Sequence, residues 1–184
     1  MSIATQTLTL EEFLRLPETK PASEFIHGEV IQKPMPQGEH RRLQEKLCEV
    51  LNQVTEPAQA AYAFPELRCS FGGESIIPDI AVFRWARIPR QPSGRVLNRF
   101  SIHPDWSIEI LSPDQSQTKV LGNLLHCTQY GTELGWLIDP DEETVLIIGA
   151  DQRVQLLKGA SLLPVISDVD LTLTVDQVFS WLVF

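Results

Sequence analysis

The spacing of apolar residues along this chain alternates between a helical and a strand-like period. Between residues 38 and 54, apolar side chains recur every three or four positions, which predicts a helix with one buried face. Two further segments, 9–17 and 174–182, begin with a Thr that is followed three positions later by Glu or Gln, the spacing of a helix capping box. Together with the helical pattern of residues 116–131, these features predict four helices.

Segments rich in β-branched and aromatic residues lie between these helices and predict strands. They are residues 62–71, 75–83, 105–112, 134–139, 144–149 and 153–159. Residues 23–34 predict a β-hairpin with His27-Gly28 at its turn. The order of the elements predicts a mixed α/β (α+β) fold, with one central sheet flanked by helices. We expect residues 1–184 to form a single domain of this kind.

The composition excludes several classes of protein. The chain has 184 residues, 43% of them hydrophobic, and no apolar stretch of the length that spans a membrane. Its first residues, MSIATQTLTLEEF, lack the basic and apolar regions of a secretory signal. The cysteines Cys48, Cys69 and Cys127 are scattered, which is typical of reduced thiols. We therefore expect a cytoplasmic protein without a membrane partner.

Charge is distributed unevenly along the chain. The formal net charge is −9, which argues against a protein that coats nucleic acid by charge alone. Residues 84–99, RWARIPRQPSGRVLNR, nevertheless hold five Arg and no acid, so the remainder of the chain carries −14. Such a segment either contacts an anionic partner or lies at the surface with its arginines paired to neighbouring acids.

Two apolar segments each contain one carboxylate. Asp79 lies in IIPDIAVF, and Glu109 lies in WSIEIL. Burying a lone carboxylate costs several kcal/mol or raises its pKa, so each needs a partner. Two carboxylates on neighbouring strands suit a hard divalent cation such as Mg²⁺ (or Mn²⁺). Alternatively, Asp79 caps the start of a strand and Glu109 pairs with an Arg.

The order of several short motifs resembles a known family. The motifs are FIHGEVIQKPMP, HRRLQEKL, IIPDIAVF, IEILSPDQ and YGTELGWLIDPDEETV, within residues 9–150. Together they resemble the Uma-type family of putative restriction endonucleases, within the PD-(D/E)XK nuclease superfamily. The resemblance implies a restriction-endonuclease-like core and a Mg²⁺-dependent phosphodiesterase site. In that site Asp79 and Glu109 would be catalytic metal ligands.

The third element of the superfamily motif is missing at its usual place. The lysine expected two residues beyond Glu109 is replaced by Leu111, and the alternative basic position on the following helix falls near Asn123. Lys119 precedes Asn123 by four residues and so lies one turn earlier on the same helix face. Lys119 is therefore the candidate catalytic lysine, or else a solvated lysine near the start of a helix.

Further candidates are polar or aromatic residues near the expected site. The resemblance implies that His40, at the start of the long helix, contacts phosphate or lies near the metal; the alternative is a structural histidine at a helix start. Glu24, Glu29, Glu45 and Glu66 are additional acidic candidates, whereas Trp136 and Trp181 are more typical of a core. We expect Arg84, Arg87 and Arg90 to contact the DNA backbone. Their segment leaves the Asp79 strand and leads to the Glu109 strand, so it is expected to begin and end near the site.

Two functions remain open from the sequence. The first is a Mg²⁺-dependent endonuclease that hydrolyses DNA phosphodiester bonds, expected to be a homodimer because two sites cut two strands. The second is a nuclease-like scaffold without turnover, which binds DNA or protein. The four histidines lack zinc-ligand spacing with the cysteines, and the chain has no GxSxG, P-loop or GxGxxG motif.

Overall fold

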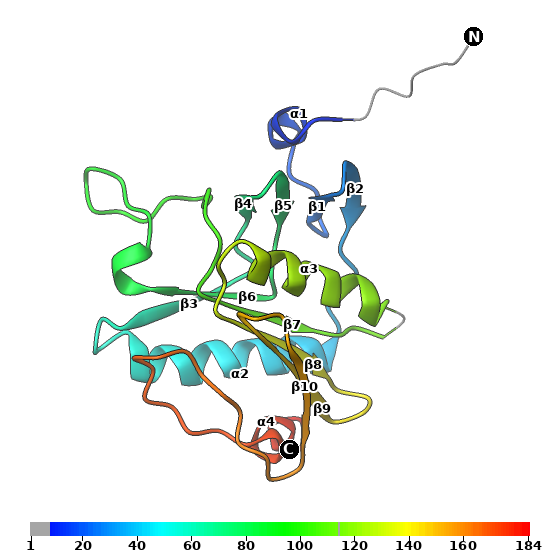
Figure 1. Cartoon of the computed structure of the whole chain (residues 1–184), viewed down its shortest axis with the longest axis vertical. Coiled ribbons are helices and arrows are strands. Elements are labelled where there is room, and N and C mark those ends of the chain that lie inside the picture. The colour runs from blue at the N-terminus through cyan, green and yellow to red at the C-terminus, as the bar shows by residue number, and fades with distance from the viewer. Residues whose placement is uncertain (1–7, 114) are drawn as a thin grey trace.

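Two β-sheets and four α-helices make up the part of the chain, residues 8–113 and 115–184, that the computed structural model describes (Figure 1). The helices are α1 (Leu10–Arg15), α2 (Gly38–Thr55), α3 (Gln117–Gln129) and α4 (Val175–Ser180). All four lie where the sequence predicts helices, and capping boxes begin α1 at Thr9 and α4 at Thr174. None of the helices in these residues is long and apolar enough to cross a membrane.

The larger sheet has six strands in the order β10-β9-β8-β7-β6-β3. They are β3 (Ala61–Pro65), β6 (Ile80–Arg84), β7 (Trp106–Ile110), β8 (Leu134–Asp139), β9 (Thr144–Gly149) and β10 (Val154–Lys158). Strands β7 and β8 are parallel, and α3 makes the crossover between them. The other four neighbouring pairs are antiparallel, so the sheet is mixed, as predicted.

A second, four-stranded sheet was not predicted. Its order is β2-β1-β5-β4, with β1 (Ser23–Ile26), β2 (Glu29–Gln32), β4 (Cys69–Phe71) and β5 (Glu74–Ile76). The hairpin β1–β2 turns at His27-Gly28, as expected, with both residues at positive φ. The small sheet and α3 lie on the same side of the large sheet (Figure 1).

Between β3 and β6 the chain crosses to the small sheet and back, and the prediction of continuous strands at 62–71 and 75–83 is wrong. The first strand ends at Glu66, whose φ of 48° takes the backbone out of the extended region. The second is interrupted at Pro78, which lacks the N–H needed for a ladder. Asp79 therefore lies in the junction between β5 and β6, directly before β6, and not inside a strand.

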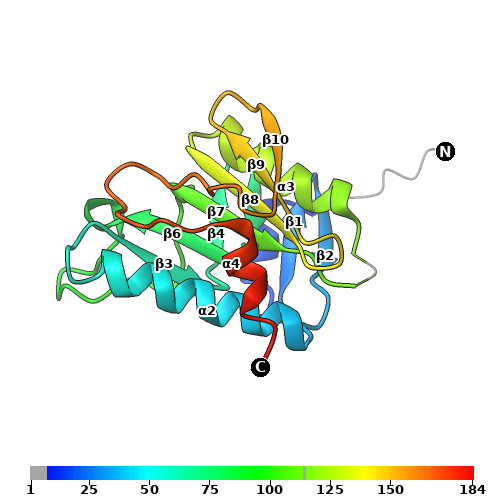
Figure 2. The same ribbon diagram turned by 90° about the horizontal axis from the view of Figure 1, so that it is seen from below.

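Helices cover both faces of the large sheet (Figures 1 and 2). Ile80 and Val82 of β6 pack in the cluster that contains the apolar residues of α2 and α4. Ala81 and Phe83 point to the opposite face, as their alternation predicts, and join a cluster that includes Cys127 of α3. The sheet is thus buried on both sides, which places the middle of β7 in the interior.

Trp136 provides a test of this packing. It is fully buried, its ring meets that of Trp106 at a centroid distance of 4.6 Å, and its indole N–H donates to the Pro164 carbonyl. We expect Trp136→Ala to lower the free energy of unfolding by about 3–5 kcal/mol, because it opens a large cavity. Urea unfolding measures this change.

Trp181, directly after α4, is the matched control because it is only partly buried against the same cluster. Trp181→Ala is expected to cost clearly less than Trp136→Ala. Equal losses from the two variants would contradict the assignment of Trp136 to the centre of the core.

Candidate functional site

Asp79 and Glu109 come together at the junction between the two sheets. Strand β6 pairs with β7 so that Ile80 faces Ile108, which places Glu109 beside the residue that precedes β6. The Ile110 N–H donates to Asp79 Oδ2 at 2.8 Å, and the Asp79 N–H points to Glu109 Oε2 at 3.4 Å. Both side chains are buried, with exposed fractions of 4%.

A lysine that the sequence analysis did not single out lies between the two carboxylates. Lys33 Nζ is 2.8 Å from Asp79 Oδ1 and 3.6 Å from Glu109 Oε2, and it donates to the Ile77 carbonyl at 2.6 Å. Lys33 directly follows β2, and its N–H extends the hairpin by donating to the Ala22 carbonyl.

Lys33 could have been identified from the sequence by working out which residues of the hairpin face one another. The turn pairs Glu24 with Ile31. Lys33 comes two residues after Ile31, just beyond the end of β2, so it lies on the same face of the hairpin as Glu24. On this face Lys33 is the one basic residue, close to Glu24, which indicates an ion pair. Because the partners of Lys33 lie far along the chain, at Asp79 and Glu109, the hairpin alone does not reveal the complete site.

Three further polar side chains complete this group. His40 of α2 places Nε2 3.0 Å from Asp79 Oδ2. Glu24 of β1 accepts the Ile77 N–H at 2.7 Å and lies 3.4 Å from the Asn123 amide of α3. We call the six residues Glu24, Lys33, His40, Asp79, Glu109 and Asn123 the buried polar cluster.

Ion pairing and burial displace the pKa values in this cluster in opposite directions. Burial alone would raise the pKa of Asp79, but the Lys33 ammonium and a hydrogen bond from His40 outweigh it and hold that pKa below its usual range. Burial likewise disfavours the charged form of Lys33, but Asp79, Glu109 and Glu24 more than compensate, so the pKa of Lys33 is raised. Asp79 and Lys33 are therefore an ionised pair at neutral pH.

Glu24 and Glu109 show the opposite behaviour. Burial, reinforced by the neighbouring carboxylates, raises the pKa of Glu24 and raises that of Glu109 well above its usual value, despite the attraction of Lys33. One ammonium thus does not balance three buried carboxylates. Among residues 8–113 and 115–184, Glu109 Oε1 also has no hydrogen-bond partner. The cluster therefore holds more carboxylates than ammonium groups, and Glu109 Oε1, which has no partner among the described residues, is free to accept a further ligand.

A divalent cation would supply the positive charge that the buried polar cluster lacks. Asp79 and Glu109 offer the hard oxygen donors that Mg²⁺ prefers, and Mg²⁺ commonly takes only one or two carboxylates and keeps several waters. In the described part of the chain, no group of three or more His, Cys, Asp or Glu residues is arranged to hold a metal ion. Asp79 and Glu109, whose backbone and side chains meet at the junction, are the residues that would hold such a cation.

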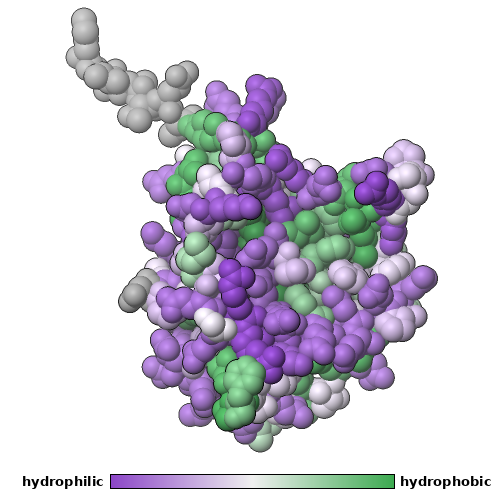
Figure 3. Space-filling model, turned by 180° about the vertical axis from the view of Figure 1, so that it is seen from behind, coloured by the Kyte–Doolittle hydropathy of each residue, from purple (hydrophilic) through white to green (hydrophobic). Residues whose placement is uncertain are grey.

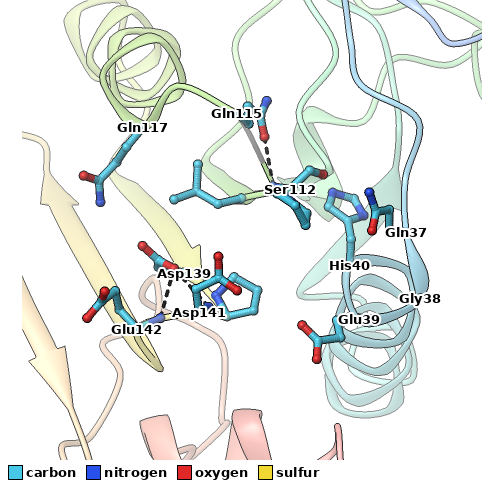
Figure 4. Close-up of a pocket in the computed structure, with 13 residues that line it drawn as sticks. Gln37, Gly38, Glu39, His40, Ser112, Gln115, Gln117, Asp139, Asp141 and Glu142 are labelled. Atoms are coloured by element: carbon cyan, nitrogen blue, oxygen red, sulfur yellow. Dashed lines mark hydrogen bonds between the residues drawn. The ribbon is translucent and has the colours of Figure 1, made fainter.

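Two cavities, each of about 420 Å³, meet at His40, Ser112 and Gln115 and carry opposite charge. The basic cavity also contains Asp79 and Lys33, and its other charged residues are Lys20, Arg41 and Glu66. The acidic cavity is lined on one side by Glu39 at the start of α2 (Figure 4). Across from it lie Asp139, Asp141 and Glu142, at the end of β8 and in the turn that follows.

The remaining candidates lie outside the buried polar cluster. Leu111 packs against the apolar cluster formed by Val120 and Leu124 of α3. Lys119 is exposed on α3 and lines a third cavity, which it shares with Glu24 and Lys33, so its catalytic role stays a prediction. The side chains of Glu29, Glu45 and Glu66 are exposed.

The placement expected for the arginine segment is wrong. Because β6 and β7 are antiparallel, the segment between them begins and ends at the strand ends opposite Asp79 and Glu109. Arg84 pairs with Asp105 and Glu133, and Arg87 also pairs with Asp105.

The surroundings of the segment are partly apolar. Arg90 lies over the Trp85 ring, and an apolar patch is visible beside this loop in the view from behind (Figure 3). A groove there is lined by Tyr62, Phe64 and Ile88, among others. The geometry thus favours the alternative of paired surface arginines, and DNA contact by Arg84, Arg87 and Arg90 stays a prediction.

The raised pKa of Glu109 predicts how stability changes with pH in the metal-free protein. Below the ordinary value of 4.5 the residue is protonated in both the folded and the unfolded chain. As the pH rises above 4.5, the unfolded chain ionises first, so the folded state loses relative stability. We expect Glu109→Gln to stabilise the protein at pH 8 by about 1 kcal/mol or more, because each unit by which the folded pKa exceeds the unfolded one costs about 1.4 kcal/mol at that pH.

Urea unfolding in the presence of a chelator, at pH 4 and pH 8, measures this gain. It should shrink towards pH 4, and the exposed control Glu45→Gln should change the free energy by less than about 0.5 kcal/mol at either pH. A destabilising effect of Glu109→Gln at pH 8 would show that Lys33 alone satisfies this carboxylate.

Comparison with known proteins identifies the family of the chain. Residues 10–176 match the model of the Uma2 family, described as "putative restriction endonuclease". A crystal structure of a "putative nuclease belonging to DUF820" from Anabaena variabilis is 54% identical, has a TM-score of 0.94, and aligns with 96% of this chain and 99% of its own. No curated protein matches the chain. The predicted family and the predicted fold class are both confirmed, and the chain belongs to the Uma2 family.

Proposed function

We propose that this protein is a Mg²⁺-dependent (or Mn²⁺-dependent) endonuclease that hydrolyses phosphodiester bonds in DNA. The observation that carries the proposal is the convergence of Asp79 and Glu109 on one ammonium, beside a carboxylate oxygen that has no hydrogen-bond partner among the described residues. Family membership and the nuclease-like structural relative support the reaction class. Perturbed ionisable groups that open into a cavity are typical of an active site.

The residues of the proposed site have different roles. Asp79 and Glu109 would hold the metal, and a divalent cation bound there would supply activation of water and compensation of charge on the phosphate. His40 and the Ile110 N–H both bond Asp79 Oδ2, so the orientation of that carboxylate is fixed before substrate arrives. Gln44 of α2 donates to the Asp79 carbonyl at 2.8 Å and holds the backbone of the junction.

The substrate is expected to approach through the basic cavity. That cavity reaches Asp79, and Lys20 and Arg41 stand on its rim, both exposed. The acidic cavity on the other side of His40 presents several carboxylates to any phosphate chain and would repel it. The DNA strand therefore follows the basic cavity to the buried polar cluster.

Cleavage of plasmid DNA with Mg²⁺ or Mn²⁺ tests the activity directly. We expect the native protein to nick or linearise the plasmid and Asp79→Ala to lose at least about 100-fold in rate, since it removes a metal ligand. Equal cleavage by both proteins would remove the proposed metal site. The absence of cleavage by the native protein, across metals and DNA forms, would favour the alternative of a nuclease-like scaffold that binds DNA or protein.

The path of the DNA is tested by removing charge from the rim. We expect Lys20→Ala/Arg41→Ala to weaken DNA binding and to reduce the slope of log K against log salt by about 1–2, because each phosphate contact contributes about 0.9. The rate at saturating DNA should change little. Arg90→Ala, at the other end of the strands, is the matched control and should bind DNA like the native protein. Weaker DNA binding by Arg90→Ala, with native binding by the double variant, would instead support the DNA contact predicted for the arginine segment.

The homodimer expected from the sequence also stays a prediction, since the structure contains one chain. Two copies of this site would be needed to cut both strands of a duplex in one encounter. Neither the metal arrangement nor the basic cavity requires the second copy.

A further inference from the structure

We propose that Lys33 is a catalytic residue of this site, supplying from the β1–β2 hairpin the ammonium that the sequence motif places on β7 or α3. The inference rests on the proposed nuclease function and adds a specific chemical role to it. Its basis is the direct contact of Lys33 with Asp79 and Glu109, together with the residues that occupy the two usual positions.

Other residues occupy the two usual positions of the lysine. Leu111, two residues beyond Glu109, packs its side chain into the apolar interface with α3. Asn123 is buried, and its amide lies 3.4 Å from Glu24. The Lys33 ammonium therefore takes the place at the carboxylates that a lysine on β7 or α3 would take.

Lys33 has the geometry of a residue that meets a substrate. Its side chain is 15% exposed, and it lines the basic cavity together with Asp79. Its ammonium has three N–H donors. One reaches the Ile77 carbonyl at 2.6 Å and one reaches Asp79 at 2.8 Å, whereas the 3.6 Å to Glu109 is longer than a hydrogen bond. The third donor is thus available to a phosphate oxygen in the cavity.

The charge of Lys33 defines what it does in the reaction. Lys33 Nζ lies 2.8 Å from Asp79 and 3.6 Å from Glu109, so in the proposed reaction it serves as a positive charge held beside the phosphate. In hydrolysis, the oxygen of a water molecule forms a bond to phosphorus and the bond to the leaving sugar oxygen breaks. The water loses its proton to solvent, the leaving oxygen takes one from solvent, and Lys33 keeps all of its own.

The structure also indicates how an ammonium could be supplied to the cluster from position 123 on α3. Glu24 lies between Asn123 and Lys33: its carboxylate contacts the Asn123 amide, and its negative charge acts on the Lys33 ammonium. A lysine at position 123 would extend further than the asparagine, so its ammonium would enter the same cluster from α3.

The decisive comparison uses the full chain and four variants: Lys33→Met, the double variant Lys33→Met/Asn123→Lys, Lys119→Met and the exposed control Lys158→Met on β10. Single-turnover plasmid cleavage with Mn²⁺ gives the rates. The rise in melting temperature on adding Mn²⁺ without DNA reports whether the metal site is intact, independently of turnover.

We expect Lys33→Met to lose about 100-fold or more in cleavage rate, the usual effect of removing one such donor. Its Mn²⁺-induced rise in melting temperature should equal or exceed that of the native protein, because the competing ammonium is gone. The double variant should recover to within about tenfold of the native rate, and Lys158→Met should cleave like the native protein.

Several results would overturn the inference. Cleavage by Lys33→Met within threefold of the native rate would do so, as would loss of activity in Lys119→Met but not in Lys33→Met. If Lys33→Met does not fold, the double variant decides, since it keeps the charge of the cluster: activity supports the inference and background cleavage refutes it. A native protein that neither cleaves DNA nor gains stability from Mn²⁺ would instead refute the proposed function.

Discussion

The contact between Lys33 and Asp79 is the interaction on which the rest of this structure depends. Asp79 lies where the chain leaves the small sheet for the large one, and Lys33 lies where the hairpin ends. Their ion pair, extended by His40 of α2, Glu109 of β7 and Glu24 of β1, joins elements that are far apart in sequence. Removing the ammonium would leave several carboxylates buried without compensation, a large penalty in a medium of low dielectric constant.

Such a cluster is a poor device for stability. Hydrophobic residues of similar volume commonly replace buried ion pairs without loss, and often with gain. Here the carboxylates outnumber the ammonium, and the raised pKa of Glu109 reflects burial and carboxylate repulsion that Lys33 does not fully offset. An unfavourable arrangement that opens into a cavity is typical of a site whose geometry serves binding or catalysis. The same positive-charge deficit that weakens the metal-free fold favours a divalent cation.

Much of the fold follows from local patterns. The four helices, the hairpin turn and the alternation of Ile80 with Ala81 are set by periodicity and capping, which act over a few residues. The division into two sheets depends instead on the positive φ of Glu66 and on the break at Pro78, and neither interrupts the apolar pattern. Asp79 and Glu109 were identified because charge inside an apolar segment is conspicuous. Lys33 was missed because a lysine at the end of a hairpin looks like an ordinary surface residue until its distant partners are known.

The distribution of charge around the site limits how DNA can reach it. An acidic protein repels DNA over most of its surface, and at physiological salt this repulsion extends about 8 Å from each charge. Lys20 and Arg41 make the basic cavity an exception, whereas Glu39, Asp139, Asp141 and Glu142 reinforce the repulsion next door. Both cavities meet at His40. A DNA strand that enters the basic cavity would therefore be repelled by the carboxylates of the acidic one. Under the proposed function this arrangement would confine the scissile phosphate beside Asp79, and the acidic residues would help to position a substrate that they do not touch.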